Sequence, residues 1–349
     1  MKSPGKPTIR YFFICIAFQC QYLIAASQTL GGNSAYNFLL LPNTPQLSAL
    51  GGINVSNITS DAGLSFNNPS LLRDDMHEQL NLSFNNMYAG VKDYQGLFAY
   101  HYDKWKTNFA AGVHFIDYGN IPQTDPSGNV YGTFHPTDYV VQLSASRKYA
   151  EKWYYGISLK FINSTYGIYS SNAAAIDVGV SYYDTARLFQ VSLVIKNMGT
   201  QLKHYLNSAG DDLPFDVEAG ITKKLAKAPV QFSITAHHLH QFNIMYNDTA
   251  FNNSNGFDQG DGKSFTFDKV FRHLIGSGQV LIGNKIELTL AYNYLLHKEL
   301  VIANTSNGFT GLSIGVGAIF KKMQIRYARS HYQNNTAYNQ FGLNLFFYD

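Results

Sequence analysis

Apolar and polar residues alternate along most of the chain. In one such stretch Ile286, Leu288 and Leu290 alternate with Glu287 and Thr289. Successive side chains of a β-strand point to opposite faces, so this pattern predicts strands with one apolar face. No segment sustains the 3.6-residue period of an amphipathic helix. The pattern predicts about fourteen strands, at residues 80–88, 93–103, 107–117, 138–149, 153–164, 172–183, 187–197, 215–223, 230–240, 269–280, 285–297, 311–320, 323–331 and 338–348.

The connections between these strands alternate in length from the second strand onward. Short turns are expected at 104–106, 150–152, 184–186, 224–229, 281–284 and 321–322, and longer loops at 118–137, 165–171, 198–214, 241–268, 298–310 and 332–337. This parity is expected of a membrane barrel, whose hairpins turn tightly on the periplasmic side and loosely outside. A soluble β-sandwich also alternates apolar and polar residues and is the alternative.

Strand length and aromatic placement favour the membrane barrel. The predicted strands are nearer the ~9–11 residues of a membrane strand than the ~5–6 of a sandwich. Aromatic residues such as Trp105 and Trp153 gather at strand ends, where interfacial girdles are expected, and the last strand is aromatic-rich (Phe346, Phe347 and Tyr348). We therefore expect an all-β, closed antiparallel transmembrane β-barrel of about 14 strands, in contact with outer-membrane lipid.

The first 79 residues do not follow the strand pattern. Residues 1–27 are typical of a signal peptide, with a basic start, an apolar stretch from Tyr11 to Ala26, and small Ala25 and Ser27 before the expected cleavage. A membrane anchor or a lipid attached at Cys20 is the alternative. Residues 28–79 are predicted to fold into the lumen as a plug, or hatch, with a periplasmic tail as the alternative; residues 80–349 are then the barrel domain.

Without the predicted signal peptide, the chain has a different net charge and a different cysteine content. The chain of 349 residues has 26 basic and 23 acidic residues, and three of the basic ones lie before residue 28. The remainder holds 23 of each sign, and both cysteines, Cys15 and Cys20, are also in the signal. The exported part therefore has no thiol for disulfides, catalysis or metal binding. A neutral chain without a basic run also argues against nucleic-acid binding.

The hatch segment resembles the long-chain fatty-acid transporter (FadL) superfamily, which combines a fourteen-stranded barrel with an N-terminal hatch. The resemblance rests on Ala49-Leu50-Gly51-Gly52, Asp61-Ala62-Gly63 and Asn68-Pro69-Ser70-Leu71-Leu72. Ala49, Leu50, Gly51, Gly52, Asn68 and Pro69 are accordingly the candidate family-motif residues. The superfamily implies a transporter of hydrophobic small molecules, with a lateral opening where one strand is kinked.

Further motifs are similar to the PorQ family, outer-membrane barrels of the type IX secretion system of Bacteroidota. They include residues 36–42, 195–201, 213–215, 222–229 and 233–239. This resemblance implies a non-enzymatic anchor and scaffold in the cell-surface attachment complex, which couples secreted cargo to anionic lipopolysaccharide. It implies a PorZ-like surface protein, a PorU-like sortase and a PorV-like barrel as partners. Loops 118–137, 198–214 and 241–268 are the expected partner surface.

Local patterns for chemistry are weak. His237, His238 and His240 suggest metal, but on a strand His237 points away from the other two, so at most two converge, whereas zinc normally takes three or four protein ligands. Residues 255–262 lack the ligand spacing of a calcium loop. No G-x-S-x-G or Walker pattern occurs. We therefore expect no enzyme activity, cofactor or metal, and the outer membrane as the location.

Overall fold

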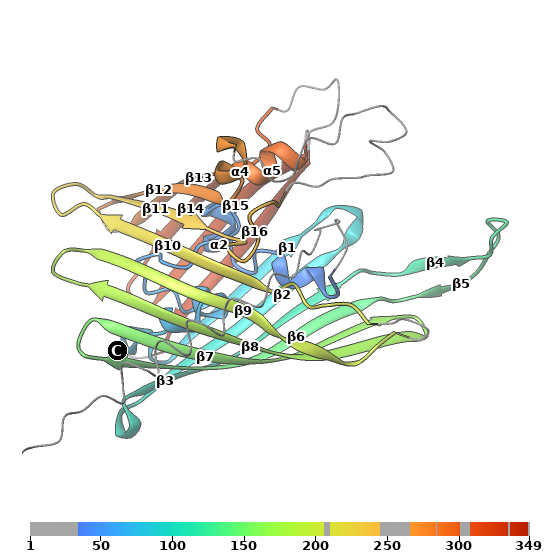
Figure 1. Ribbon diagram of the computed structural model, residues 1–349, viewed down its shortest axis with the longest axis horizontal. Helices are drawn as coiled ribbons and strands as arrows, with labels where there is room; N and C mark the ends of the chain where they lie inside the picture. Colours follow the sequence, from blue (N-terminus) through green and yellow to red (C-terminus); the bar gives the residue numbers. More distant parts are fainter. Residues whose placement is uncertain are drawn as a thin grey trace, which may run out of the picture.

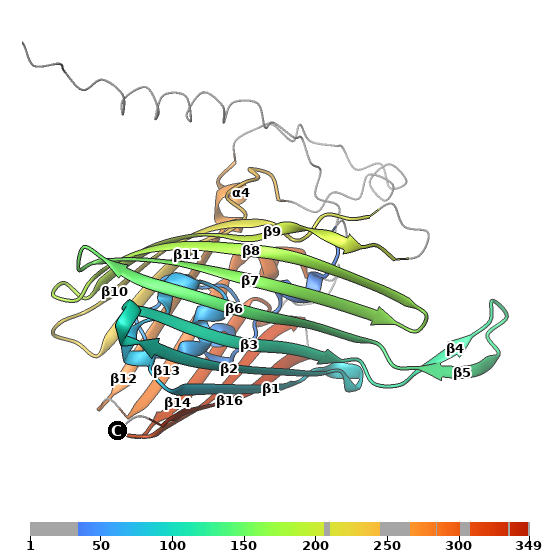
Figure 2. The same ribbon diagram turned by 90° about the horizontal axis from the view of Figure 1, so that it is seen from below.

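The chain folds into a closed antiparallel barrel of fourteen strands, described by a computed structural model (Figures 1 and 2). The structure describes residues 34–205, 210–244, 266–283, 285–300, 308–333 and 336–347. The predicted signal peptide, residues 1–27, lies outside them. The first and last strands close the barrel, with Gln79 opposite Phe346 and Asn86 opposite Asn339. All-β architecture, antiparallel pairing, closure and strand number are as the sequence predicted.

The barrel strands run in sequence order around the wall, apart from a separate hairpin, β4–β5, between β3 and β6. The strands are β1 (Gln79–Asn86), β2 (Lys92–Tyr102), β3 (Thr107–Asp117), β4 (Ile121–Thr124), β5 (Val130–Phe134), β6 (Thr137–Tyr149), β7 (Trp153–Tyr166), β8 (Tyr169–Asp184), β9 (Phe189–Lys203), β10 (Asp216–Lys224), β11 (Val230–Ala236), β12 (Leu274–Ile282), β13 (Ile286–Asn293), β14 (Leu312–Ile319), β15 (Met323–Gln333) and β16 (Thr336–Phe346).

Short helices occupy the hatch and the connections. They are η2 (Asn37–Leu40), α2 (Pro45–Ala49), η3 (Ala62–Phe66), η4 (Pro69–Leu71) and η5 (Asp74–Met76) in the hatch, and η6 (Tyr88–Gly90), η7 (Asp103–Trp105), α4 (Phe267–Arg272) and α5 (Tyr294–Glu299) between strands. No helix among the described residues is long and apolar enough to cross a membrane.

Several predicted boundaries were wrong at the rim that carries the longer connections, here called the loop rim. The loop expected at 165–171 is a two-residue turn, because β7 and β8 continue pairing up to Tyr166 and Tyr169. The strand expected at 230–240 ends at Ala236, and those expected at 269–280 and 285–297 each include a helix, α4 or α5. Much of the loop expected at 198–214 is strand β9, and the one at 118–137 holds the β4–β5 hairpin.

The barrel is apolar outside and polar inside. On β7, Ile157, Leu159 and Phe161 are 44%, 53% and 43% exposed, whereas Ser158 and Lys160 between them are buried in the lumen. A globular protein in water does not expose such a band, but a barrel in lipid requires it, and closure gives each wall strand a partner on both sides. Trp105, Trp153 and Tyr149 are exposed at the rim of the short turns, as expected of an interfacial girdle. The chain is therefore built as a transmembrane β-barrel.

The wall has unequal height. Strands β6 to β9 have 13 to 16 residues, whereas β10 to β14 have 7 to 9. On the tall side the β4–β5 hairpin projects beyond the loop rim (Figure 2). The hatch, residues 34–78, lies inside the barrel between these two sides (Figures 1 and 2).

Candidate functional site

The hatch contains a short α-helix, α2, whose ends are fixed by its sequence. The Thr44 hydroxyl accepts a hydrogen bond from Leu47 N at 3.1 Å, and Pro45 occupies the first turn, where a missing N–H costs nothing. Gly51 and Gly52 follow α2 with φ of +93°, a conformation that side chains disfavour. The chain thus reverses directly after α2, which keeps the segment compact enough to fit the lumen.

The predicted motif residues Ala49, Leu50, Gly51 and Gly52 all lie at this reversal. Leu50 is fully buried with Leu47, Leu64 and Leu71 in a small apolar core of the hatch itself. The Gly51 carbonyl accepts a hydrogen bond from Asn293 Nδ2 on the barrel wall at 3.1 Å.

The predicted residues Asn68 and Pro69 lie in a second turn of the hatch, beside β7 and β8. Asn68 Nδ2 donates to the Val55 carbonyl at 2.8 Å, and its Oδ1 accepts from Ser70 N at 3.0 Å and Ser70 Oγ at 2.7 Å. The Ser70 hydroxyl also lies 2.6 Å from Ser181 Oγ of the wall. The structure therefore gives Asn68 a positioning role inside the hatch, with Ser70 as the contact to the barrel.

Inward-facing glycines make room for the hatch. A Cβ atom added at Gly156 would lie 2.5 Å from the Pro69 carbonyl carbon, and one at Gly342 would lie 2.5 Å from Pro45 Cγ. Gly179 and Gly315 face Asn68 and Ala49 equally closely. These glycines explain much of the small-residue content on the polar faces of the strands: the hatch backbone packs directly against the wall.

Buried ion pairs join the hatch to the wall. Arg326 Nη1 lies 2.9 Å from Asp61 Oδ2 of the hatch, and its Nη2 lies 3.5 Å from Glu287 Oε2 of β13. All three side chains are at most 8% exposed. Gly317 pairs with both Glu287 and Arg326 in the sheet, and the missing side chain between them lets the two charges meet. On the other side, Lys196 Nζ donates to Asn67 Oδ1 of the hatch at 3.0 Å.

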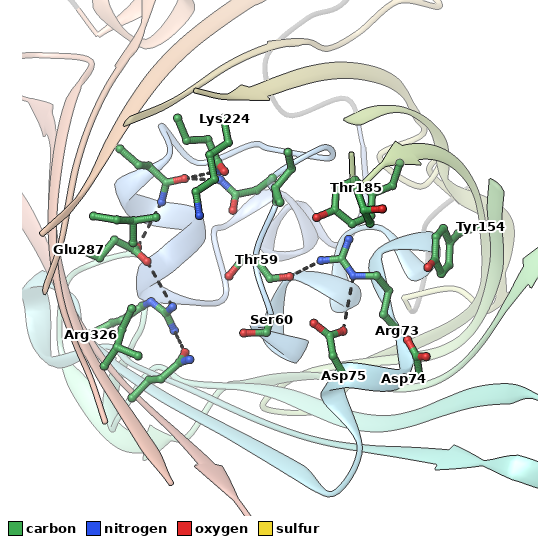
Figure 3. A pocket seen from close by; sticks show the side chains of 18 of the residues that line it. Thr59, Ser60, Arg73, Asp74, Asp75, Tyr154, Thr185, Lys224, Glu287 and Arg326 are labelled. Carbon is green, nitrogen blue, oxygen red and sulfur yellow. Dashed lines mark hydrogen bonds and ion pairs between the residues drawn. The ribbon is translucent and has the colours of Figure 1, made fainter. Parts of the chain in front are cut away.

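A polar vestibule of about 510 Å³ opens beneath the hatch at the rim of the short turns (Figure 3). Arg73 and Arg326 lie on opposite sides of it in Figure 3. Arg73 donates to the Thr59 carbonyl and to Gln190, lies 3.6 Å from Asp75, and stacks on the Tyr183 ring at 4.9 Å. Both guanidinium groups are thus engaged by protein groups, so this arrangement holds the hatch in place.

The sequence alone does not reveal this ion-pair cluster. Asp61 stands out there only as part of a family motif, Glu287 only as one polar position of an alternating strand, and Arg326 not at all. A charge at such a position is costly to bury unless it is paired. Charged residues at inward-facing positions therefore indicate that ion pairs exist. Which residues form each pair depends on the register of strands that are distant in the sequence.

A bulge in the wall, between β8 and β9, is bridged by an ion pair and hydrogen bonds. The β8–β9 register shifts between Ile176 and Val178, and Asn197 opposite has a φ of +56°. Asn197 N donates to Asp177 Oδ1 at 2.8 Å, and Lys160 Nζ lies 2.5 Å from Asp177 Oδ2 and 3.0 Å from Asn197 Oδ1. The Gly-rich strand β14 pairs regularly with both of its neighbours.

The histidines differ from their predicted arrangement. Because β11 ends at Ala236, His237 and His238 do not alternate across a strand as predicted, and both rings lie near Asp216. Burial and the adjacent His238 ring lower the pKa of His237 to about 3, so its imidazole is neutral at ordinary pH. The calcium alternative at 255–262 lies outside the described residues.

No family model matches the chain, and no curated protein matches it. Among solved structures, the chain is similar to a deltaS2 mutant of the TodX monoaromatic hydrocarbon channel, with 12% identity, a TM-score of 0.49, and coverage of 87% of this chain and 98% of that one. It is also similar to the KdgM porin (7% identity, TM-score 0.36, coverage 77% and 99%) and to CdiB from Acinetobacter baumannii (10%, 0.36, coverage 76% and 59%). These likenesses are too distant to carry an activity over to this chain.

Proposed function

We propose that the protein is an outer-membrane anchor and scaffold, whose hatch closes the barrel and whose projecting hairpin holds a surface partner. The PorQ-family resemblance supplies the setting: the attachment complex of type IX secretion, with a PorZ-like surface protein held near a PorU-like sortase and a PorV-like barrel. The observation that carries the proposal is the β4–β5 hairpin, which extends beyond the loop rim on the tall side of the wall (Figures 1 and 2).

The hairpin is well braced at its base. His135 Nε2 lies 2.8 Å from Asp117 Oδ1, and the Tyr118 hydroxyl donates to Asp138 Oδ2 at 2.7 Å. Burial, together with the hydrogen bonds to Tyr166 and Asp138, raises the pKa of Tyr118, so this hydroxyl keeps its proton. A braced hairpin loses little entropy on binding, which favours a role in docking.

The hairpin also presents apolar groups to solvent. Val130 and Tyr131 are each 65% exposed, and Ile121 on the facing strand is 38% exposed. Both strands belong to a two-stranded sheet, so each has an edge free for pairing with another chain. Exposed apolar side chains on a free sheet edge suit a protein partner. Of the other predicted partner loops, residues 206–209 of the loop 198–214 and residues 245–265 of the loop 241–268 lie outside the described residues.

The alternative, a transporter of hydrophobic small molecules, fits the lumen less well. The apolar part of the described lumen is filled by the hatch, with Phe38, Phe66 and Met76 buried against β2, β3 and β6 to β8. The bulged wall is closed by Lys160 and Asp177, where a lateral opening would need an apolar gap. Recovery of the purified protein with a bound fatty acid or hydrocarbon would favour transport instead.

The test removes exposed apolar side chains from the hairpin without changing its length. In the double variant Val130→Ser/Tyr131→Ser, we expect affinity isolation from outer membranes to recover the barrel at the wild-type amount but without its surface partner, and cargo to leave the cell surface. Thr133→Ala, an exposed substitution on the same strand, is the matched control. Full retention of partner and cargo by the double variant, or isolation of the wild type without any surface or secretion component, would refute the proposal.

A further inference from the structure

A cluster of histidines and one aspartate lies at the loop rim on the short side of the wall. It forms where β11 ends. His237 N still donates to the His273 carbonyl at 3.0 Å, but His238 has a φ of +53°. In an extended strand, consecutive side chains point to opposite faces. The left-handed residue breaks this alternation, and the Nδ1 atoms of His237 and His238 come to lie 2.5 Å apart.

A buried carboxylate completes the cluster. Asp216, the first residue of β10, is 2% exposed, and its Oδ1 accepts a hydrogen bond from His238 N at 2.7 Å. One ligand atom each from Asp216, His237 and His238 lies within 4.8 Å of the others. His240 lies beside them, with Nδ1 3.6 Å from Asp216 Oδ1. Three or four candidate ligands of the types that zinc prefers are therefore within reach of one position.

Two atoms of the cluster lack a hydrogen bond from the part of the protein that the structure describes. They are His237 Nε2 and Asp216 Oδ2, both buried, and the latter has only the longer contact to His238 Nδ1 at 3.6 Å. Two imidazole nitrogens at 2.5 Å repel each other unless a proton or a cation lies between them. Buried polar atoms are normally paired, and a missing partner calls for a specific cause such as an ion. A cation among these groups would relieve both the orphaned atoms and the close pair.

The neighbouring groups hold the ring of ligands in place. His273 Nδ1 donates to the His237 carbonyl at 2.7 Å, and its Nε2 lies 3.2 Å from the Phe242 carbonyl. A neutral imidazole donates only one N–H, so His273 supports the backbone of His237 through the shorter of these contacts. Metal sites commonly depend on such outer contacts to orient their ligands.

We propose that Asp216, His237 and His238 form a binding site for a divalent metal ion of the zinc class, with His240 positioned as a fourth ligand. Two imidazoles and one carboxylate suit Zn²⁺ better than Ca²⁺ or Mg²⁺, which prefer oxygen ligands alone. The ion would tie the start of β10 to the segment that leaves β11. It would thereby fasten the loop rim where the wall is lowest.

The test measures bound zinc in the intact protein. The full-length barrel, isolated without a histidine tag, is stripped with a chelator, incubated with Zn²⁺ alone, dialysed, and assayed for metal by mass spectrometry. We expect close to one zinc ion per chain. Asp216→Asn and His238→Gln are each expected to lose that ion. His135→Gln, which alters a half-exposed histidine at the same rim but outside the cluster, is expected to keep it.

A second measurement does not depend on the variants. Cobalt(II) bound in place of zinc should give the strong visible absorption of a four-coordinate site. Heat-modifiable migration in detergent confirms that each preparation is folded, and His238→Gln is the least disruptive variant because its side chain is 25% exposed. The proposal is overturned if the wild type retains no zinc, if both cluster variants retain as much as the wild type, or if bound cobalt shows only the weak absorption of a six-coordinate ion.

Discussion

The ion pair between Arg326 and Asp61 should decide whether the hatch stays in the lumen. We consider Arg326→Met, which removes the charge but keeps most of the side-chain length. Arg326 is 5% exposed. Its guanidinium group lies 2.9 Å from Asp61, 3.5 Å from Glu287 and 2.7 Å from Gln324. After its loss, Asp61 keeps hydrogen bonds from Gly63 N and Asn81 Nδ2. Its negative charge, however, then has no buried counter-charge among the described residues.

The expected cost follows from the burial of the pair. Removing one partner of a buried ion pair typically costs about 3–5 kcal/mol, because the remaining charge is left unpaired. Asp61 belongs to the hatch and becomes hydrated when the hatch leaves the lumen. Most of this cost therefore destabilises the docked state of the hatch relative to the undocked state. At 1.4 kcal/mol per factor of ten, the undocked fraction should rise by roughly two to four orders of magnitude.

Single-channel recording in planar lipid bilayers measures this directly. The wild type should be closed almost all the time, whereas Arg326→Met should show frequent conducting events. The double variant Asp61→Asn/Arg326→Met also removes the buried charge of Asp61, so it should open less often than Arg326→Met alone. Heat-modifiable migration shows that the barrels compared are equally assembled.

Two results would refute the reasoning. The first is that Arg326→Met conducts no more than the wild type at equal barrel content, which would mean that other contacts hold the hatch. The second is that the double variant opens at least as often as Arg326→Met, which would mean that loss of the guanidinium contacts, and not the unpaired carboxylate, causes the opening.

Three further predictions test other parts of the structure. Gly156→Ala, whose new Cβ would meet the hatch backbone at 2.5 Å, should destabilise the protein by about 1–3 kcal/mol in denaturant unfolding, whereas Gly276→Ala, with open space around its Cβ, should not. Leu159→Arg should destabilise the barrel folded into lipid vesicles by about 2–4 kcal/mol, far more than Leu159→Ala, if β7 faces lipid. Hydrogen bonds from Asn129 hold the pKa of Asp125 below its ordinary 3.8. The stability that these hydrogen bonds give to the β4–β5 turn is present above pH 3.8 and is lost as the pH falls through the lowered pKa. The Asn129 amide resonance should therefore titrate with a midpoint below 3.8.

The sequence located most of the wall because alternation is a local signal. The strand predicted at 107–117 matches β3 residue for residue, and the first residue of the one predicted at 153–164 is the first residue of β7. It failed at strand ends. There, pairing with a neighbour extended β7 and β8 to a two-residue turn, while the residues after Asn293 turned into α5, for which Asn293 accepts the capping hydrogen bond from Leu296 N.

What the sequence by itself determined is therefore the class of fold: an apolar outer face, a polar inner face, the strand number, and a segment before the first strand that is not strand. Only the tertiary structure decided which residues act together. Asp61 and Arg326 are joined across 265 positions, and Asp216 meets His237 and His238 because one left-handed residue ends the alternation. The physical reason is that alternation depends on the backbone of one strand, whereas charge pairing and ligand convergence depend on register and on where each strand stops.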